Sequence, residues 1–178
     1  LLVDGSMSGY DFKMDYYNND GTWETMCVNG ALCIIKLLQI LEYEFISYIF
    51  KAGDGDHNIK FDNDSIYIRM NTPTFKATDL TLHGITGSYV DSGAKHFVLS
   101  TDITNCDTLY EIAQKIRYDD CFQPHGLNVN FLHVIDPNNI RVITYEKGIE
   151  GIMQSCGSGS VASAFYAAFK GDLMSPLN

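Results

Sequence analysis

The chain reads CVNGALCIIKLL over residues 27–38 and CGSGSVASAF over residues 156–165. In both stretches a cysteine and nearby glycines come directly before apolar residues, which is typical of a loop that enters a helix. A strand candidate ending in tyrosine precedes each stretch, at Tyr17 and at Tyr145. The repeat predicts two copies of one strand–loop–helix unit, with Cys27 and Cys156 at the helix N-termini. It suggests a pair of acid/base groups that face each other across a cleft.

A thiol at a helix N-terminus has a definite chemistry. The unpaired N–H groups and the positive end of the helix dipole favour thiolate over thiol, so we expect the pKa of both cysteines to be lowered towards neutrality. The same N–H groups bind carboxylates, and small residues let such a ligand approach the backbone at Gly30, Gly157 and Gly159. These features predict removal of a proton α to a carboxylate by one thiolate and its return by the other thiol. The alternative is that each cysteine is a small buried residue without reactivity.

The composition limits the partners. The formal net charge is −10 and no basic cluster occurs, which argues against nucleic-acid binding. The most apolar stretch, residues 34–50, carries Lys36, Glu42 and Glu44, so it is interpreted as a core helix with a following segment rather than a membrane span. The five cysteines show no zinc-site spacing, and no disulfide framework is expected, so we predict no metal and a reducing cytoplasm. The chain starts without Met or a cleavage signal, and an internal or processed start is expected.

The hydrophobic periodicity predicts a mixed α/β (α+β) chain with antiparallel strand pairs and one central helix in each half. Pro73 predicts a boundary between the halves, because the strand pattern ends there and restarts after it. In the first half we expect a strand over 11–17, a helix over 30–40 and a hairpin over 51–70. The apolar face of that helix is predicted to hold Ile34, Leu37, Leu38 and Leu41. In the second half we expect a helix over 109–118, a helix from Cys156 to about Lys170 that stops at Gly171, and strands over 87–90, 95–99, 127–135 and 140–145.

The remaining histidines and cysteines are predicted to take no part in chemistry. Turn-rich segments, typical of a surface, hold His57, His83 and His125. A strand position predicts a satisfied side chain for His133. The thiols without helix-start context are expected to be inert: Cys33, Cys106 and Cys121.

Four motifs resemble those of the diaminopimelate epimerase family. Residues 18–31 (NNDG…MCVNGA) resemble the family's Asn-Ala-Asp-Gly…Met-Cys-Gly-Asn-Gly-Ala, and residues 145–159 (YEKG…SCGSG) resemble its Tyr-Glu-Arg-Gly…Ala-Cys-Gly-Ser-Gly. Residues 95–98 (KHFV) are similar to its Pro-His-Phe-Val, and residues 126–131 (GLNVNF) to its Val-Asn-Val-Asn-Phe strand. The motifs occur in the family's order and cover nearly the whole chain.

The resemblance implies a fold and an activity. The fold would be two pseudo-symmetric domains, residues 1–74 and 75–178, each with strands wrapped around a central helix. The activity would be cofactor-independent, two-base interconversion of LL- and meso-diaminopimelate in lysine and peptidoglycan synthesis, with Cys27 and Cys156 as alternating base and acid. His96 and Glu146 match residues that tune the pKa of the cysteines. The positions that match substrate contacts are Asn18, Val28, Asn29, Asn128, Glu146, Lys147, Gly157 and Ser158. The expected partner is therefore a small-molecule amino acid, and a homodimer is possible in such a family.

The chain differs from the family pattern at the distal end of the expected substrate. Ala94 replaces an Asn, Lys147 replaces an Arg that grips a carboxylate, and Val28 replaces a Gly. These differences keep two alternatives open: a racemase of another amino acid on the same fold, and a non-catalytic ligand-binding relative. A thiol hydrolase is a weaker third reading, because no His is paired with either Cys in a local motif. The family's N-terminal Gly-Asn-Asp-Phe segment and the strands after its second helix have no counterpart, so we expect both domains to be truncated.

Overall fold

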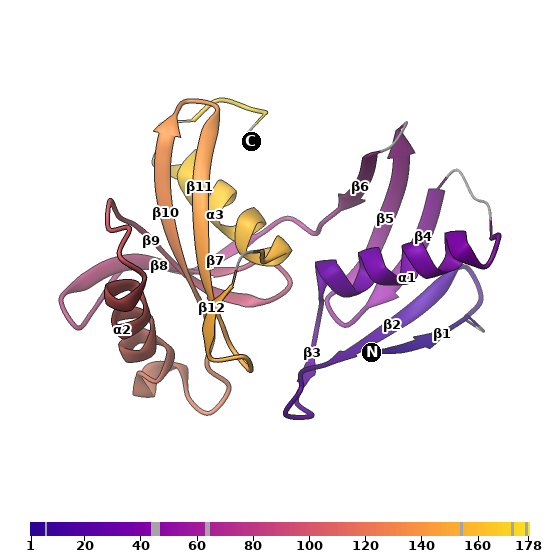
Figure 1. The fold of residues 1–178 in the computed structure, drawn as a ribbon, viewed down its shortest axis with the longest axis horizontal. Helices are drawn as coiled ribbons and strands as arrows, with labels where there is room; N and C mark the ends of the chain where they lie inside the picture. The colour runs from indigo at the N-terminus through magenta and orange to yellow at the C-terminus, as the bar shows by residue number, and fades with distance from the viewer. Residues whose placement is uncertain (6, 44–46, 63–64, 154, 172, 177) are drawn as a thin grey trace. The chain divides into compact units, whose positions relative to one another are not determined.

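The computed structural model describes the chain except residues 6, 44–46, 63–64, 154, 172 and 177 (Figure 1). It divides into two compact units, Leu1–Thr72 and Pro73–Asn178. Each unit has its own sheet and its own hydrophobic core. In the described part of the chain, no helix is long and apolar enough to cross a membrane.

The first unit is a six-stranded sheet with one helix, α1 (Val28–Ile40) (Figure 1). The strand order is β1-β2-β4-β5-β6, and β3 pairs with β2. The strands are β1 (Leu2–Asp4), β2 (Phe12–Tyr17), β3 (Trp23–Glu24), β4 (Ser47–Ala52), β5 (Gly55–Asp62) and β6 (Ser65–Arg69). β2 and β4 are parallel, with α1 between them in the sequence, and the other pairs are antiparallel.

The core of the first unit joins α1 to the sheet. Phe12 of β2 is buried and stacks on the ring of Phe50 of β4, with ring centroids 4.9 Å apart. The helix contributes Ala31, Ile34 and Ile35, all buried in the same cluster. This packing holds α1 against the sheet and so fixes the helix N-terminus at which Cys27 lies.

The second unit is a six-stranded sheet in the order β12-β11-β10-β9-β8-β7. The strands are β7 (Thr74–Leu82), β8 (Ile85–Asp91), β9 (Lys95–Ser100), β10 (Asn128–Asp136), β11 (Asn139–Glu146) and β12 (Gly151–Met153). All pairs are antiparallel except β9 with β10, which α2 (Cys106–Arg117) and a short 3-10 helix (Asp120–Phe122) connect. The last helix, α3 (Gly157–Lys170), follows β12.

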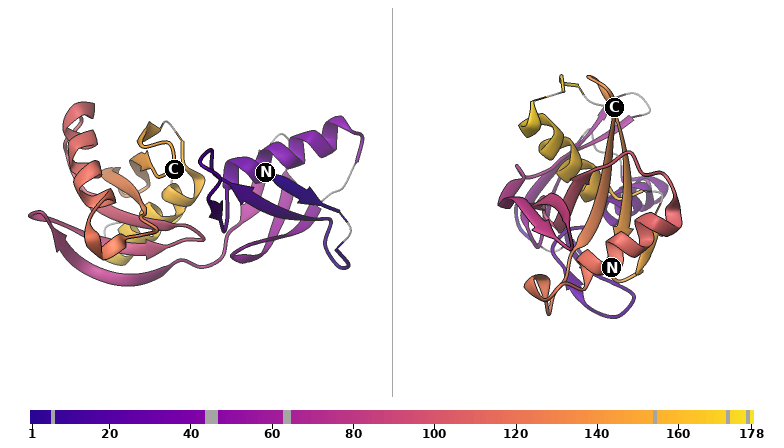
Figure 2. Two further views of the ribbon diagram at one scale, coloured as in Figure 1. Left: turned by 90° about the horizontal axis from the view of Figure 1, so that it is seen from below. Right: turned by 90° about the vertical axis from the view of Figure 1, so that its left-hand side faces the viewer.

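Two helices cover opposite faces of the second sheet (Figure 2). Successive strand residues point to opposite faces, so Phe97 of β9 packs in the cluster with Leu109 of α2, whereas Val98 packs with Ala162 of α3. On β10, Asn128 and Asn130 share the α3 face with Leu132, because they alternate with it. The polar end of that face therefore lies beside the start of α3.

Most predicted elements are present, and the differences have physical reasons. The buried face of α1 holds Ala31, Ile34 and Ile35, whereas Leu37 and Leu41 are exposed, so part of the predicted face is wrong. The helix carries apolar residues on nearly all of its faces, so the hydrophobic periodicity alone did not define the buried face. β7 was missed because two register shifts interrupt its pairing with β8. The turn expected within 61–66 falls partly on residues outside the described ones.

Two predictions for single residues are also corrected. His57 is fully buried rather than at the surface. Its two ring nitrogens form hydrogen bonds with the Asp54 carboxylate and the Arg69 carbonyl, which satisfy the ring inside the unit. Cys106 is the first residue of α2, so it does have a helix-start context, although Asn105 and not a thiol caps that helix. His83 and His125 are exposed as predicted, and His133 pairs with Asp102.

Candidate functional site

Cys27 is the N-cap of α1. Its backbone is extended, with φ −135° and ψ 107°, and its sulfur accepts a hydrogen bond from the Gly30 N–H at 3.3 Å. An N–H group that donates to sulfur favours the thiolate. The side chain is half-buried, so it is partly open to a ligand.

Three of the predicted substrate contacts lie near Cys27 in the sequence, and their side chains have different surroundings. Asn18 lies at the end of β2, and its amide donates to Thr22 and to the Glu24 carboxylate, which orders the loop before Cys27. Val28 packs partly buried against the core of the first unit, so that core takes up its side chain. Asn29 is exposed in the first turn of α1.

Cys156 is the N-cap of α3 and repeats the conformation of Cys27. Its φ of −139° and ψ of 108° lie within a few degrees of those of Cys27, and a glycine, Gly159, again follows three residues later. The sulfur makes no capping hydrogen bond of the kind seen at Cys27, and it lies 3.6 Å from the Ser158 hydroxyl instead. The two units therefore share one helix-start geometry with different surroundings for the thiol.

A chain of buried polar contacts leads away from Cys156. The Ser158 hydroxyl lies 3.0 Å from His96 Nε2, and His96 Nδ1 lies 3.1 Å from the Asn130 amide nitrogen. The same nitrogen donates to the Gly159 carbonyl at 3.1 Å. His96 and Asn130 are fully buried, so their contacts are shielded from water. His96 thus reaches Cys156 only through Ser158.

The expected lowering of the pKa is wrong for Cys156. Burial raises the pKa of this thiol to about 12, and the neighbouring Glu146 carboxylate acts in the same direction. The Ser158 hydroxyl and the Gly159 N–H lower the pKa, but they do not outweigh burial. Burial also lowers the pKa of His96 to about 4, against the opposing Asp91 carboxylate, so the imidazole is neutral at physiological pH. At neutral pH Cys156 is therefore a thiol, and the histidine behind Ser158 is neutral.

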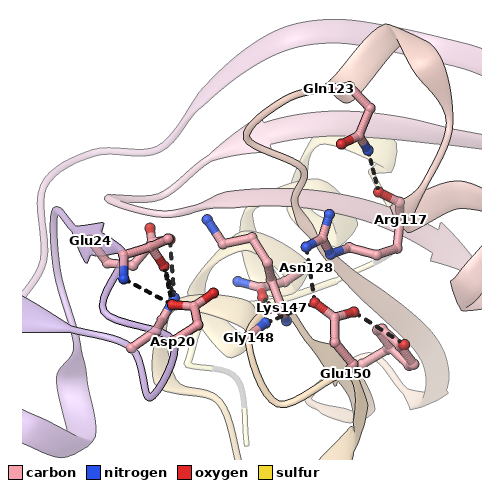
Figure 3. Close-up of polar contacts among 11 residues, drawn as sticks. Asp20, Glu24, Arg117, Gln123, Asn128, Lys147, Gly148 and Glu150 are labelled. Atoms are coloured by element: carbon pink, nitrogen blue, oxygen red, sulfur yellow. Dashed lines mark hydrogen bonds and ion pairs between the residues drawn. The ribbon is translucent and has the colours of Figure 1, made fainter.

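A second group of polar residues orders the loop after β11 (Figure 3). Asn128 accepts a hydrogen bond from the Lys147 N–H at 2.8 Å through its side-chain oxygen. Glu150 accepts from the Gly148 N–H at 3.0 Å and from the Arg117 guanidinium at 2.9 Å, which ties the loop to α2. The loop therefore holds the backbone of Lys147 in one position.

The structure groups the predicted residues by unit. In the second unit, Ser158 and Glu146 lie beside Cys156, with His96 behind Ser158, and Gly157 begins α3. The first unit holds Cys27 with Val28, Asn29 and Asn18. Motif matching missed three residues of these networks: Asn130, Arg117 and Glu150. Asn130 had one available signal, which is that it lies two residues from Asn128 on the same strand face. Among the described residues, no group of three or more His, Cys, Asp or Glu side chains could hold a metal ion.

Two solved structures resemble this chain. A hydroxyproline epimerase from Agrobacterium vitis, solved with bound trans-4-OH-L-proline, matches 98% of this chain and 60% of its own length with a TM-score of 0.78. A Bacillus anthracis phenazine biosynthesis protein of the PhzF family matches 91% of this chain and 63% of its own length with a TM-score of 0.57. The sequence identities are 15% and 17%, so the likeness concerns the fold. It confirms the predicted fold class.

Sequence comparison gives a closer relationship. A diaminopimelate epimerase of Flavobacterium psychrophilum is 36% identical over 166 residues, which are 92% of this chain and 62% of the relative. The diaminopimelate epimerases of Methanocella arvoryzae and Aquifex aeolicus are 33% and 28% identical, over 62% and 60% of their lengths. The chain thus spans about 60% of the length of these relatives. No family model matches it. These similarities run through both units and support membership of the diaminopimelate epimerase family.

Proposed function

We propose that this chain provides the two catalytic thiols of a cofactor-independent epimerase that interconverts LL- and meso-diaminopimelate. The observation that carries the proposal is the repeated N-cap, in which Cys27 and Cys156 start two helices with the same backbone conformation. A carboxylate bound by helix N–H groups would leave its α-proton for a thiol to remove. The curated relatives named diaminopimelate epimerase support the choice of substrate.

The two thiols differ in a way that assigns their starting roles. The Gly30 N–H donates to the Cys27 sulfur, which favours a thiolate and so a base. Burial and Glu146 keep the proton on Cys156, whose pKa is about 12, so this thiol is the acid. In the proposed step the Cys27 sulfur takes the α-proton, the C–H electron pair moves into an enediolate stabilised by the helix N–H groups, and Cys156 delivers its proton to the opposite face. The reverse reaction exchanges these roles.

Solvent hydrogen exchange tests this proposal. In D2O, each diaminopimelate isomer should gain deuterium at its α-carbon, and Cys27→Ser or Cys156→Ser should slow interconversion by roughly 10²–10⁴-fold. Cys33→Ser is a matched control, because Cys33 is an exposed thiol on α1 away from the helix start. Full interconversion by both the Cys27 and the Cys156 variant would rule out two-thiol catalysis.

Two alternative functions make different predictions in the same assay. Lys147 offers a point charge where the family pattern has a bidentate Arg, and Ala94 has no polar group for the distal end of a substrate. A racemase of another amino acid should therefore exchange the α-proton of a different member of an amino-acid panel and not that of diaminopimelate. A non-catalytic relative should bind diaminopimelate without any exchange.

We also propose that the protein works in a reducing compartment, the cytoplasm, as a homodimer. Both proposed thiols must be reduced to carry a proton, and the five cysteines are free in the structure. Sedimentation of the reduced protein tests the dimer, and a monomeric mass at micromolar concentration would contradict it.

A further inference from the structure

Asn130 is a fully buried polar residue whose contacts fix its orientation. The Gly159 carbonyl lies 3.1 Å from Asn130 Nδ2, and a carbonyl only accepts hydrogen bonds, so the amide nitrogen must face it. One hydrogen of the NH2 group is used by this bond. The other is left for His96 Nδ1, 3.1 Å away.

This orientation determines the tautomer of His96. A nitrogen that accepts a hydrogen bond carries no proton, so the neutral imidazole must hold its single proton on Nε2. Full burial of the ring keeps it neutral. The Nε2–H then donates to the Ser158 oxygen, 3.0 Å away.

The Ser158 hydroxyl completes this series of hydrogen bonds. Its oxygen accepts from His96, so its own hydrogen is available for another acceptor, and the Cys156 sulfur lies 3.6 Å away. The Ser158 carbonyl accepts a hydrogen bond from Ser92, also buried, which holds this first turn of α3 in place. A hydroxyl that donates to sulfur stabilises the thiolate formed when Cys156 gives up its proton.

We infer that Asn130 is a positioning residue, which fixes the tautomer of His96 and thereby turns the Ser158 hydroxyl hydrogen towards the Cys156 sulfur. We call the hydrogen bonds that run from Asn130 through His96 and Ser158 to the Cys156 sulfur the relay. The role of the relay in catalysis rests on the proposed function, whereas the directions of its hydrogen bonds do not. The relay opposes the Glu146 carboxylate, which favours the thiol form at the same sulfur.

Nitrogen NMR of the full chain, labelled at histidine, tests the first step directly. At neutral pH His96 should show a protonated Nε2 and an unprotonated Nδ1. Protonation at Nδ1 would overturn the inference, whatever the protein catalyses. This measurement needs no substitution and no substrate.

The second step is tested by the rate at which iodoacetamide alkylates Cys156, followed by mass spectrometry of its peptide in the folded chain. Asn130→Leu and Ser158→Ala should each slow alkylation roughly tenfold, which corresponds to a rise of about one unit in the pKa of Cys156. The double variant should be no slower than Ser158→Ala, because Asn130 acts through that hydroxyl. Effects that simply multiply would overturn the relay.

Thr144→Val is the matched control. Thr144 is buried beside the same helix start, with its hydroxyl next to Gly159, and the described hydrogen bonds of the His96 ring go to Ser158 and Asn130 rather than to Thr144. This variant should leave alkylation of Cys156 within about twofold of the parent. An equal slowing by Thr144→Val would mean that packing under α3, and not the relay, controls the sulfur.

The outcomes separate this inference from the proposed function. A protonated Nε2 and a non-additive double variant, with no exchange of any amino acid, would support the relay and reject the epimerase. Exchange of the α-proton of diaminopimelate together with a protonated His96 Nδ1 would support the epimerase and reject the relay. If Asn130→Leu does not fold, the relay is tested by the tautomer of His96 in the parent protein and by the effect of Ser158→Ala on alkylation of Cys156.

Discussion

Gly159 lies beneath two buried polar side chains at the start of α3. A Cβ added there would lie 3.0 Å from both Asn130 Oδ1 and Thr144 Oγ1, which is tighter than most real Cβ contacts, so these neighbours would have to shift. Because both neighbours are buried and cannot swing into solvent, Gly159→Ala should lower the free energy of unfolding by roughly 1–3 kcal/mol. Urea unfolding followed by circular dichroism measures this change.

A matched substitution tests the reason for that cost. Gly151 has nothing within 4 Å of an added Cβ, so Gly151→Ala should change the free energy of unfolding by less than about 0.5 kcal/mol. Equal costs at the two glycines would show that the contacts with Asn130 and Thr144 do not matter.

At the scale of single residues, the sequence predicted that Cys27 and Cys156 start helices but not the environment of these thiols. Cys156 and its helix start were identified from the pattern, yet the expected shift of its pKa was in the wrong direction. Burial and the Glu146 carboxylate decide that shift, and both come from the folded chain rather than from the local sequence. Asn130 was missed for the same reason, since its partners, His96 and Gly159, lie on other elements.

At the scale of elements, α1 shows how an apolar helix buries one face and exposes another. Ile35 is fully buried, whereas Leu37 is 52% exposed. Ile35→Ala should therefore destabilise the first unit by about 2–5 kcal/mol, because it leaves a cavity against the sheet. Leu37→Ala, which removes a similar volume, should change stability by less than about 0.5 kcal/mol. Chemical denaturation followed by Trp23 fluorescence measures both, and a similar loss for Leu37→Ala would contradict the assigned face.

The helix could be predicted as an element but its buried face could not. Residues 31–38 are all apolar except Lys36, so several faces fit the 3.6-residue period equally well. Contacts with Phe12 and Phe50 of the sheet decide which face is used. By contrast, the end of α3 was predicted well, because Gly171 adopts a left-handed conformation with φ 90° that favours glycine.

The loop after β11 depends on Glu150, which links it to α2. Glu150→Ala removes the acceptor of both the Arg117 guanidinium and the Gly148 N–H. Because the Arg117 side chain is only 11% exposed, losing its partner should cost roughly 1–3 kcal/mol. Hydrogen exchange at the Gly148 amide should accelerate at the same time. Glu150→Gln keeps an oxygen acceptor and should have a smaller effect on both measurements, and unchanged exchange in Glu150→Ala would contradict this role.

At the scale of the whole molecule, the two units carry buried histidines of opposite character. Burial of His57 in the first unit opposes its protonation, but the Asp54 carboxylate and the Arg69 carbonyl prevail and raise its pKa. Burial lowers the pKa of His96 in the second unit to about 4. The sequence placed both histidines in the chain but predicted neither environment, since each depends on contacts formed only in the folded unit.

These opposite shifts predict that acid changes the stability of the two units in opposite directions. A raised pKa stabilises the fold below the unfolded value, near 6.5, and that contribution is lost as pH rises through the folded pKa, so acidification should stabilise the first unit through His57. A lowered pKa stabilises the fold above 6.5, and that contribution is lost as pH falls towards 4. Going from about pH 7.5 to about pH 5.5 should therefore cost the second unit about 1 kcal/mol through His96.

The single tryptophan allows the two responses to be measured in one protein. Trp23 belongs to the first unit and packs on Gly53, so its fluorescence follows that unit, whereas amide signals of β9 and β10 follow the second. On acidification the urea midpoint from Trp23 should rise while the midpoint from β9 and β10 falls. His57→Asn should abolish the first change only and His96→Asn the second only, and His125→Asn, at an exposed position, should alter neither. The two urea midpoints could instead move together in the parent protein and in all three variants. This result would show that the units unfold as one cooperative block and that their separate cores do not give them separate stabilities.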